Sequence, residues 1–429
     1  MAEIKAFKGL RFNTEKAGSI STLCCPPYDI ISDSQRQTYL ADNPYNIVRL
    51  ELPKGDTPYE TASIILKQWE SDGILTLEDQ PAIYIYEEEF SAYNEQRSIK
   101  GIIVRVKLEE FSKEVVLPHE FTLSKAKEDR LNLMKATNCN FSQIYALYMD
   151  GGHNTLQKAD IMSKGDPLLT VTDSDGVTHR LWKITNQSDI SNIIEDFKDR
   201  KLYIADGHHR YETALNYRNY CRDQGISTND DGNNMQDYQM FYLVDMAHPG
   251  LVVFPTHRLI RGLKDYDKNK VLELCGPYFS IEEQKDTSTM EKILEKQYEE
   301  GKTAFGFYSG DGIWYLLTLT DENIIPKLLP GVSPATQKLD VTVLHTLILE
   351  KIFGIDKENM AKQINLTYIK IFEEAISAVD SSKFQCAFIL NPTRVSEIRD
   401  VASAGEKMPQ KSTYFYPKTI TGLVMNKLV

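Results

Sequence analysis

The sequence predicts an α+β protein with more than one domain. The chain has 429 residues, whereas a single domain usually takes roughly 100–200. Two β-rich runs, 82–90 and 98–108, flank a polar segment and predict a β-hairpin. Apolar residues recur at helical spacing over 57–69, and a short apolar strand at 202–205 leads through a glycine turn into a helix at 211–222. This mixture of hairpin, strand and helix indicates the α+β class.

A change in composition near residue 263 divides the chain. We expect residues 1–263 to form a catalytic or nucleotide-binding region, with 150–200 as a peripheral insertion because that stretch is rich in turn signals. Lysine-rich helical segments alternate with strands over 264–383, which predicts an accessory α/β domain. The final segment, 384–429, is expected to return towards the active site.

The charge restricts the partners. Lysine and arginine total 49 against 61 acidic residues, giving a net charge of -12. Nucleic acids and anionic membranes require a broad cationic surface, so we expect neither, whereas a local basic pocket suits a small anion. No apolar run reaches the roughly 18 residues of a membrane span, and the N-terminus lacks a secretory pattern. The 6 cysteines have no framework spacing, which predicts reduced thiols in a cytoplasmic protein. The sequence does not set the oligomeric state.

The segment Asp206-Gly207-His208-His209-Arg210 has the composition of a phosphate-binding turn. It joins the strand to the helix, so backbone N–H groups and the helix dipole converge there. Gly207 lets a ligand approach the backbone, and Arg210 can fork two hydrogen bonds onto phosphate oxygens. His208 and His209 can donate to the same oxygens or shuttle a proton, and Asp206 can hold Mg²⁺ or orient a histidine. The alternative is a plain helix cap by Asp206.

A second candidate is the loop Pro118-His119-Glu120-Phe121-Thr122, which also leads into a helix. His119, Thr122 and, further along, Arg130 can bind the phosphates of a nucleotide. Glu120 is a candidate catalytic base. The alternative is a capping arrangement in which Thr122 or Ser124 satisfies the helix start.

A third candidate, Asp29, ends the segment Pro26-Pro27-Tyr28-Asp29. Consecutive prolines fix an extended backbone, and a stiff loop can hold a general base with little loss of entropy. We therefore expect Asp29 to be catalytic or, alternatively, to cap the helix that begins near Ser32.

Two further pairs are candidates for substrate binding. His257 and Arg258 directly follow an apolar strand, and ligands gather at strand ends in α/β sheets. Lys411 and Ser412 precede an aromatic run, and the ammonium group of Lys411 can reach a phosphate as a point charge. The alternative for His257 and Arg258 is a solvated surface position.

Metal-binding patterns are sparse. The sequence has no Cys-x-x-Cys pair, and adjacent histidines do not readily ligate one ion, so we expect no structural zinc. Mg²⁺ that arrives with ATP or ADP fits better, with Asp206 as its contact. Neither a P-loop nor a Rossmann glycine pattern occurs.

A series of motifs resembles a widespread bacterial family that is known only as a domain of unknown function. The motifs span nearly the whole chain in the same order. They are Pro-Pro-Tyr-Asp (26–29), Asn-Pro-Tyr-Asn-Ile-Val-Arg-Leu-Glu (43–51), Pro-His-Glu-Phe-Thr (118–122), Asp-Arg-Leu-Asn-Leu (129–133), Asp-Gly-His-His-Arg-Tyr-Glu-Thr-Ala-Leu (206–215), Pro-Thr-His-Arg-Leu (255–259) and Met-Pro-Gln-Lys-Ser-Thr-Tyr-Phe-Tyr-Pro-Lys (408–418).

Around residues 206–210 that family is similar to the ParB/sulfiredoxin superfamily, whose Gly-His-x-Arg turn binds nucleotide or other phosphates. Free-serine kinases of this superfamily carry an Asp-Gly-His-x-Arg turn and phosphorylate L-serine, with a glutamate as base. The resemblance implies a ParB/sulfiredoxin-like core with an additional C-terminal α/β domain. It also implies phosphate contacts for Gly207, His208, His209 and Arg210, and a magnesium or serine contact for Asp206.

We therefore predict a small-molecule kinase that uses ATP or ADP with Mg²⁺ to convert L-serine to O-phospho-L-serine. Phosphoryl transfer depends mainly on positioning and charge neutralisation, which a cationic helix start supplies. No counterpart of the kinase glutamate stands out, so Asp29 and Glu120 are both candidates for the base. The alternatives are a phosphatase or nucleotide hydrolase that uses the same turn, and a non-catalytic ParB-like nucleotide-binding regulator.

Overall fold

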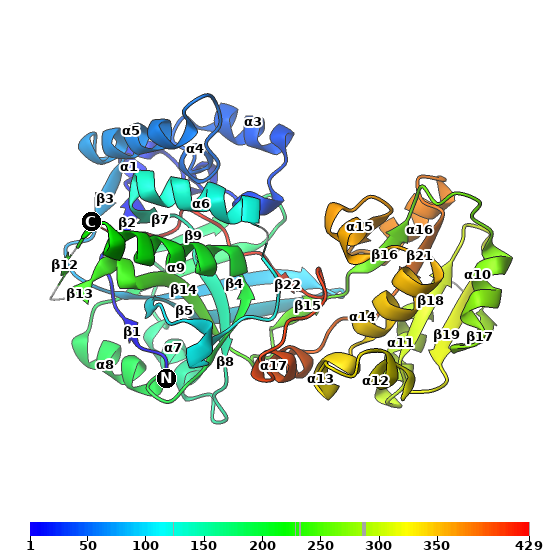
Figure 1. Cartoon of the computed structure of the whole chain (residues 1–429). Helices are drawn as coiled ribbons and strands as arrows, with labels where there is room; N and C mark the ends of the chain where they lie inside the picture. Colours follow the sequence, from blue (N-terminus) through cyan, green and yellow to red (C-terminus); the bar gives the residue numbers. More distant parts are fainter. Residues whose placement is uncertain (123, 228, 231–232, 285–288, 429) are drawn as a thin grey trace. The chain divides into compact units, whose positions relative to one another are not determined.

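The computed structural model describes residues 1–122, 124–227, 229–230, 233–284 and 289–428. They form two compact units, and Figure 1 labels many of their elements. The first unit comprises Met1–Pro118, Thr122–Val252 and Pro417–Val429, and the second comprises His119–Phe121 and Val253–Tyr416. Helices and sheets are mixed within each unit, so the predicted α+β class is confirmed at this level.

The strands of the first unit are β1 (Ile4–Lys5), β2 (Gly9–Phe12), β3 (Leu75–Leu77), β4 (Ile83–Ala92), β5 (Glu95–Lys107), β6 (Val116–Leu117), β7 (Cys139–Asn140), β8 (Ile144–Tyr148), β9 (Leu169–Thr172), β10 (Thr178–Ile184), β11 (Leu202–Asp206), β12 (Asn229–Asp230), β13 (Asn233–Asn234), β14 (Tyr238–Asp245) and β23 (Met425–Lys427). Its helices are α1 (Thr14–Ala17), α2 (Ile20–Leu23), η1 (Tyr28–Ile30), α3 (Asp33–Asp42), α4 (Val48–Glu51), α5 (Pro58–Ser71), η2 (Phe111–Lys113), α6 (Ser124–Thr137), α7 (Asn154–Met162), α8 (Gln187–Asp196), α9 (His208–Asp223) and η3 (Met235–Asp237).

The large sheet of the first unit is mixed. Its strand order is β6-β11-β8-β14-β5-β4-β10-β9, and β1 also pairs with β5. The predicted hairpin is confirmed as β4 and β5, which pair antiparallel. The strands β8 and β14 are parallel, as are β6 and β11. Within the stretch 150–200, which we predicted to be a peripheral insertion, β9 and β10 form the edge of this same sheet.

Two hydrophobic cores stabilise the first unit. One lies on the large sheet, where side chains of α8 and α9, such as Ile193 and Tyr211, pack against sheet residues such as Phe241. The other lies between α5 and a small sheet of order β3-β2-β23-β7, and contains Trp69 and Leu10. The strand β23 is the part of the C-terminal segment that lies in this unit, so the last residues of the chain belong to the same unit as the first.

The strands of the second unit are β15 (Val252–Phe254), whose first residue belongs to the first unit, and β16 (His257–Ile260), β17 (Phe279–Gln284), β18 (Ala304–Tyr308), β19 (Trp314–Leu319), β20 (Leu366–Ile369), β21 (Cys386–Ile389) and β22 (Tyr414–Tyr416). Its helices are α10 (Lys268–Cys275), α11 (Met290–Glu299), α12 (Ile324–Leu328), α13 (Pro334–Gln337), α14 (Asp340–Val343), η5 (Leu344–Ile352), α15 (Lys357–Lys362), α16 (Phe372–Asp380) and α17 (Val395–Ser403).

The second unit is built on a sheet of order β17-β19-β18-β21-β16-β20. Each of these neighbouring strands pairs antiparallel, so the sheet is not the parallel type that an α/β domain would have. We placed the boundary near residue 263, but the units divide at Val252 because β16 is an inner strand of the second sheet. For the same reason 384–416 belongs to the second unit, since β21 lies between β18 and β16.

The cap of α3 differs from the residue that the sequence offered as an alternative. Ser32, and not Asp29, caps α3, because its side chain accepts from the Gln35 backbone N–H in a capping box. Among the described residues, none of the helices combines the length and the apolar character that crossing a membrane takes.

Candidate functional site

The turn between β11 and α9 is set by Gly207. This residue is the N-cap of α9 and has φ +96°, in the left-handed region that favours glycine. A Cβ atom at this position would lie 2.9 Å from Arg210 Nε, so the close approach of the guanidinium also requires glycine. Gly207 gives α9 no side-chain cap. The alternative in which Asp206 caps the helix is wrong.

Asp206, the last residue of β11, bridges two cations. Its Oδ2 accepts from Arg210 Nη2 at 2.6 Å, and its Oδ1 accepts from Lys418 Nζ at 2.7 Å. Burial alone would raise the pKa of Asp206, but the charges of Lys418 and Arg210 hold it well below its ordinary value. Asp206 therefore fixes both cations at the start of α9. Lys418 was not among the predicted site residues.

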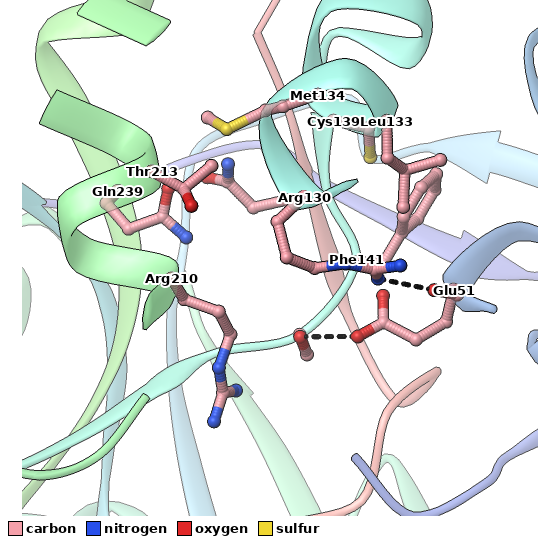
Figure 2. A pocket seen from close by; sticks show the side chains of 11 residues that line it. Glu51, Arg130, Leu133, Met134, Cys139, Phe141, Arg210, Thr213 and Gln239 are labelled. Carbon is pink, nitrogen blue, oxygen red and sulfur yellow. Dashed lines mark hydrogen bonds between the residues drawn. The ribbon is translucent and has the colours of Figure 1, made fainter. Parts of the chain in front are cut away.

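Arg210 connects this turn to a polar cavity. Its side chain is largely buried, and Nη1 donates to the main-chain oxygen of Gln143. The cavity has a volume of about 40 Å³ and is shown in Figure 2. Besides Arg210, its polar lining comes from Glu51, Arg130, Asn140, Ser142, Thr213 and Gln239. We refer to it below as the Glu51 cavity.

Arg130, a predicted phosphate ligand, lines the Glu51 cavity from α6. Its Nη1 donates to the main-chain oxygen of Glu51 at 2.5 Å, and Nε and Nη2 donate to Asp129 Oδ2 at 2.8 and 2.6 Å. The guanidinium carbon lies 4.1 Å from the ring centroid of Tyr28, a cation–π contact. The structure therefore brings Arg130 and Arg210 to one cavity, and the proline loop packs beside them.

Asp29 follows Tyr28 in η1 and is exposed. Burial and the charge of Asp29 raise the pKa of Tyr28 to about 12, and Asp29 also acts on the carboxyl group of Glu51. Asp29 thus lies within electrostatic reach of the cavity and is open to solvent, as a base that meets a substrate must be.

Glu51 is the last residue of the motif at 43–51, but it was not among the predicted site residues. It is 3% exposed, and its Oε1 accepts from Ser142 Oγ at 2.9 Å. Burial raises the pKa of Glu51, while the charge of Arg130 opposes that shift. Glu51 lies next to the apolar Leu50 in the short segment Val48–Glu51, and a charged residue beside apolar neighbours was the signal that could have revealed it.

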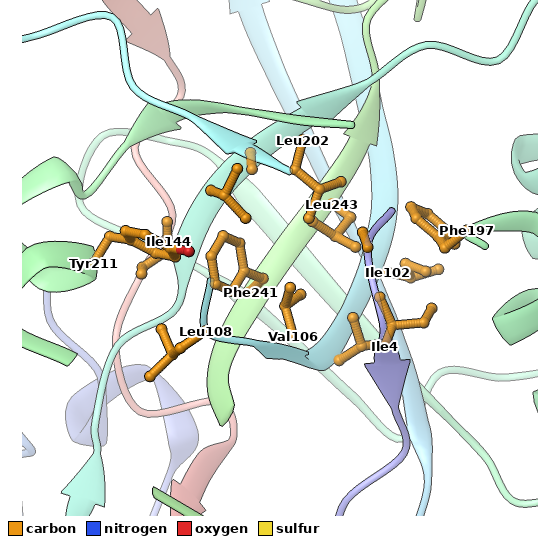
Figure 3. Packing of buried hydrophobic residues seen from close by; sticks show 14 of the residues in the cluster. Ile4, Ile102, Val106, Leu108, Ile144, Phe197, Leu202, Tyr211, Phe241 and Leu243 are labelled. Carbon is orange, nitrogen blue, oxygen red and sulfur yellow. The ribbon is translucent and has the colours of Figure 1, made fainter. Parts of the chain in front are cut away.

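The hydrophobic core holds α9 in place behind the turn. Tyr211 packs beside Phe241 of β14, and both belong to the cluster in Figure 3. The Tyr211 hydroxyl also donates to the main-chain oxygen of Glu109 at 2.7 Å. A helix anchored this way has little freedom in its first turn.

The remaining predicted residues of the first unit lie on or near α9. His208 is buried and His209 is partly buried in the first turn of the helix. The charge of His208 also lowers the pKa of Asp206. Thr122 Oγ1 donates to Glu212 Oε2 at 2.7 Å, and Lys127 Nζ donates to the same oxygen at 2.7 Å. The Thr122 hydroxyl is therefore used to attach the loop to α9.

The second unit brings together residues of the predicted segments 118–122, 255–259 and 408–418. His119 is buried, and its Nε2 lies 3.0 Å from Thr413 Oγ1. The Lys411 backbone N–H donates to Glu120 Oε1 at 3.4 Å. The side chain of Lys411 is exposed, whereas Ser412 is buried and its Oγ donates to the Pro409 oxygen at 2.5 Å. The prediction placed His119 and Glu120 in one region with residues 206–210, but they belong to this unit.

Arg258 and His257 are buried within the second unit. Arg258 donates from Nη2 to the Lys411 oxygen at 3.1 Å and from Nη1 to Thr256 Oγ1 at 2.6 Å. Burial and the charge of Arg258 lower the pKa of His257 to about 3, so this imidazole is neutral at physiological pH. The alternative of a solvated surface position is wrong for both residues. Neither residue lines the Glu51 cavity.

The described residues contain no cluster of three or more His, Cys, Asp or Glu side chains that could hold a metal ion. Both oxygens of Asp206 already accept hydrogen bonds from cations. The donor set therefore does not fit a resident magnesium site at Asp206.

The fold and this site define an α+β protein with a cationic helix start beside a polar cavity. The chain belongs to the family described as "Protein of unknown function (DUF1015)", whose model matches residues 4–342. No curated protein matches the sequence.

Several solved structures are similar to the chain at low identity. One is a conserved hypothetical protein from Pyrococcus furiosus, with 16% identity and a TM-score of 0.36 over 76% of this chain and 95% of that chain. Another is free serine kinase in complex with AMP, with 13% identity and a TM-score of 0.36 over 76% and 90%. A third is SbnI with a C-terminal truncation from Staphylococcus aureus, with 11% identity and a TM-score of 0.33 over 74% and 86%.

Proposed function

We propose that this chain is a small-molecule kinase that transfers a phosphoryl group from ATP or ADP to the hydroxyl group of a free amino acid, with L-serine as substrate and O-phospho-L-serine as product. One observation carries the proposal: Asp206 holds Arg210 and Lys418 at a helix start whose N-cap is a glycine. Such a start binds multiply charged phosphate groups. The motif resemblance adds the proposal that this unit has a ParB/sulfiredoxin-type core.

The residues at the turn would share the work of holding phosphate. The start of α9, with Gly207 as its N-cap, would contribute backbone donors to phosphate oxygens. Arg210 and Lys418 would neutralise the charge that moves during transfer, which is the main task of an enzyme in this chemistry. His208 and His209 would supply further donors or a proton path in the same turn.

Two carboxylates are proposed as the base that accepts the hydroxyl proton. Asp29 is exposed and lies in the same unit as the helix start, whereas Glu120 lies in the second unit and accepts the Lys411 N–H. The variants Asp29→Asn and Glu120→Gln distinguish them, because the loss of the base lowers kcat by about 100-fold or more and leaves nucleotide affinity nearly unchanged.

Magnesium would arrive with the nucleotide rather than occupy a resident site. Bound to the phosphates, Mg²⁺ would neutralise part of their charge. This fits the engagement of both Asp206 oxygens with cations. The test is whether Mg²⁺ binds the protein only in the presence of ATP or ADP.

The kinase proposal is tested by incubating the purified full chain with L-serine, Mg²⁺ and either ATP or ADP, and detecting O-phospho-L-serine by ³¹P NMR. We expect the product with one donor, and its loss in Arg210→Met. If neither donor gives O-phosphoserine, the serine kinase proposal is wrong. Release of inorganic phosphate without serine would instead favour a phosphatase or nucleotide hydrolase, and nucleotide binding without turnover would favour a regulator.

A further inference from the structure

The Glu51 cavity contains buried polar atoms that the protein itself does not satisfy. Gln239 Oε1, on β14, has no hydrogen-bond partner among the described residues, and neither does Asn140 Nδ2, on β7. Both side chains are more than nine-tenths buried and line the cavity. Unsatisfied buried groups are rare in native proteins, so their presence at a cavity indicates a ligand.

The orientation of Asn140 is fixed by its other atom. Asn140 Oδ1 accepts from Asn426 Nδ2 at 2.8 Å and from the Met240 backbone N–H at 3.3 Å. The amide is therefore oriented so that its donor, Nδ2, is the atom without a partner among the described residues. Gln239 Oε1 is an acceptor, so the cavity presents unsatisfied groups of both kinds.

Glu51 adds a second acceptor with a negative charge. Ser142 satisfies Oε1, whereas the structure gives Oε2 no partner in the part of the chain that it describes. The nearby Arg130 donates to the main-chain oxygen of Glu51 and to Asp129, not to the Glu51 carboxylate. Arg130 and Arg210 act on the Glu51 carboxylate through their charges, but neither makes an ion pair with it among the described residues. A buried carboxylate oxygen without a direct hydrogen-bond donor is unfavourable, so a positively charged donor group of a ligand would stabilise it.

We propose that the Glu51 cavity receives the head group of an α-amino acid. The ammonium group would donate to Glu51 Oε2 and Gln239 Oε1, and the carboxylate would accept from Asn140 Nδ2 and face Arg130. This inference deepens the proposed function, on which it rests for the phosphoryl donor.

A zwitterion fits this lining better than the other small ligands. A phosphate group would meet the Glu51 carboxylate, and a plain cation would leave the Asn140 donor unsatisfied. The volume of about 40 Å³ suits a small head group and would hold few additional atoms. The cavity therefore selects an amino acid with a short side chain. Its hydroxyl group would lie towards Arg210, which lines both the cavity and the helix start.

The inference is tested by calorimetric titration of the full chain with L-serine and with 3-hydroxypropanoate, which lacks only the ammonium group. We expect wild type to bind L-serine about tenfold or more tightly than 3-hydroxypropanoate, the effect of one charged hydrogen bond. Glu51→Gln keeps the shape of the side chain and should lose that preference. Glu60→Gln, an exposed residue of α5, is the matched control and should retain it.

Each outcome decides the inference separately from the kinase proposal. Equal binding of L-serine by wild type and Glu51→Gln would overturn it, as would a wild type that binds no L-serine or does not distinguish the two ligands. Thermal unfolding of Glu51→Gln checks that the variant is folded, and Ser142→Ala should weaken L-serine binding by a smaller factor. Failure of the kinase proposal alone would appear as amino-acid binding without phosphoryl transfer. Failure of this inference alone would appear as phosphorylation of hydroxyl compounds that lack an ammonium group.

Discussion

The two compact units each contain a motif arginine near a helix or strand end, but they use it differently. In the first unit, Arg210 is held by the carboxylate of Asp206 and lines a cavity. In the second, Arg258 is 1% exposed and its Nη groups donate to Thr256 and to the Lys411 oxygen. Both guanidinium groups donate to a main-chain oxygen, but only Arg210 also pairs with a carboxylate at a helix start. Arg258 has no carboxylate partner among the described residues, and its hydrogen bonds connect chain segments.

The surroundings of the two arginines support the same distinction. Around Arg210, the cation Lys418 also lies at the start of α9, and the nearby carboxylates are Asp206 and Glu51. Around Arg258, the neighbouring imidazole of His257 is forced to be neutral. These surroundings fit the proposed anion site in the first unit and a buried polar junction in the second.

The largest expected effect separates the two arginines. Arg210→Met removes a charged partner of the bound phosphate and should weaken ADP binding by about 100-fold, since losing one member of a buried charged contact costs about 2–5 kcal/mol. Arg258→Met should leave ADP affinity within about twofold and lower the free energy of unfolding by about 1–3 kcal/mol. Calorimetry and urea unfolding of both variants measure these quantities. Similar losses of ADP affinity in both would remove the distinction between the units.

The next effect is the loss of folding stability at acid pH that His257 of the second unit causes. The pKa of His257 is about 3 in the fold and 6.5 in the unfolded chain, so only the unfolded chain binds this proton between those values. The resulting stability is complete above pH 6.5 and is lost as the pH falls towards 3, by about 3 kcal/mol between pH 7 and pH 4. His257→Gln should flatten the dependence of the unfolding free energy on pH in this window.

Asp206 provides the contrast in the first unit. Its folded pKa is lowered from 3.8, so the stability it contributes is present above that value and is lost only at lower pH. Asp206→Asn should therefore change the pH dependence below about pH 4 and not between pH 4 and pH 7. A flattening between pH 4 and pH 7 in Asp206→Asn would contradict the assignment of the two windows.

The smallest expected effect concerns two glycines of the first unit. Gly207 and Gly176 both have positive φ, but a Cβ at 176 would meet nothing within 4 Å, whereas one at 207 would meet the Arg210 guanidinium. Gly176→Ala should cost only backbone strain, about 1 kcal/mol, and Gly207→Ala about 2–3 kcal/mol. Only Gly207→Ala should also weaken ADP binding. Equal unfolding costs and equal ADP affinities would show that the contact with Arg210 has no role.

The sequence was sufficient where the signal is local. The strand, turn and helix of residues 202–222 were predicted from an apolar run, a glycine and helical spacing. The structure has β11 and α9 in this segment. The hairpin of β4 and β5 was likewise visible, because β-rich runs flank a polar turn. These patterns depend on neighbours within a few residues, which a single sequence displays directly.

The sequence was insufficient where partners are distant along the chain. Lys418 pairs with Asp206 across 212 residues of sequence, and no periodic pattern in the sequence predicts such a distant pair. Glu51 faces the cavity only because α4 packs near α6, and its hydrogen bond to Ser142 spans 91 residues. The domain boundary was misplaced for a similar reason, since a strand does not reveal which sheet it will join.

The most direct test of the central claim is NMR of the full chain with ¹⁵N-labelled histidine, titrated with ADP. The chain has 8 histidines, so their backbone N–H signals are few and can be assigned by substitution. We predict that the signals of His208 and His209, in the first turn of α9, shift and saturate as ADP binds, while that of the buried His345 does not. Saturable binding of ADP that leaves the His208 and His209 signals unchanged would contradict the account.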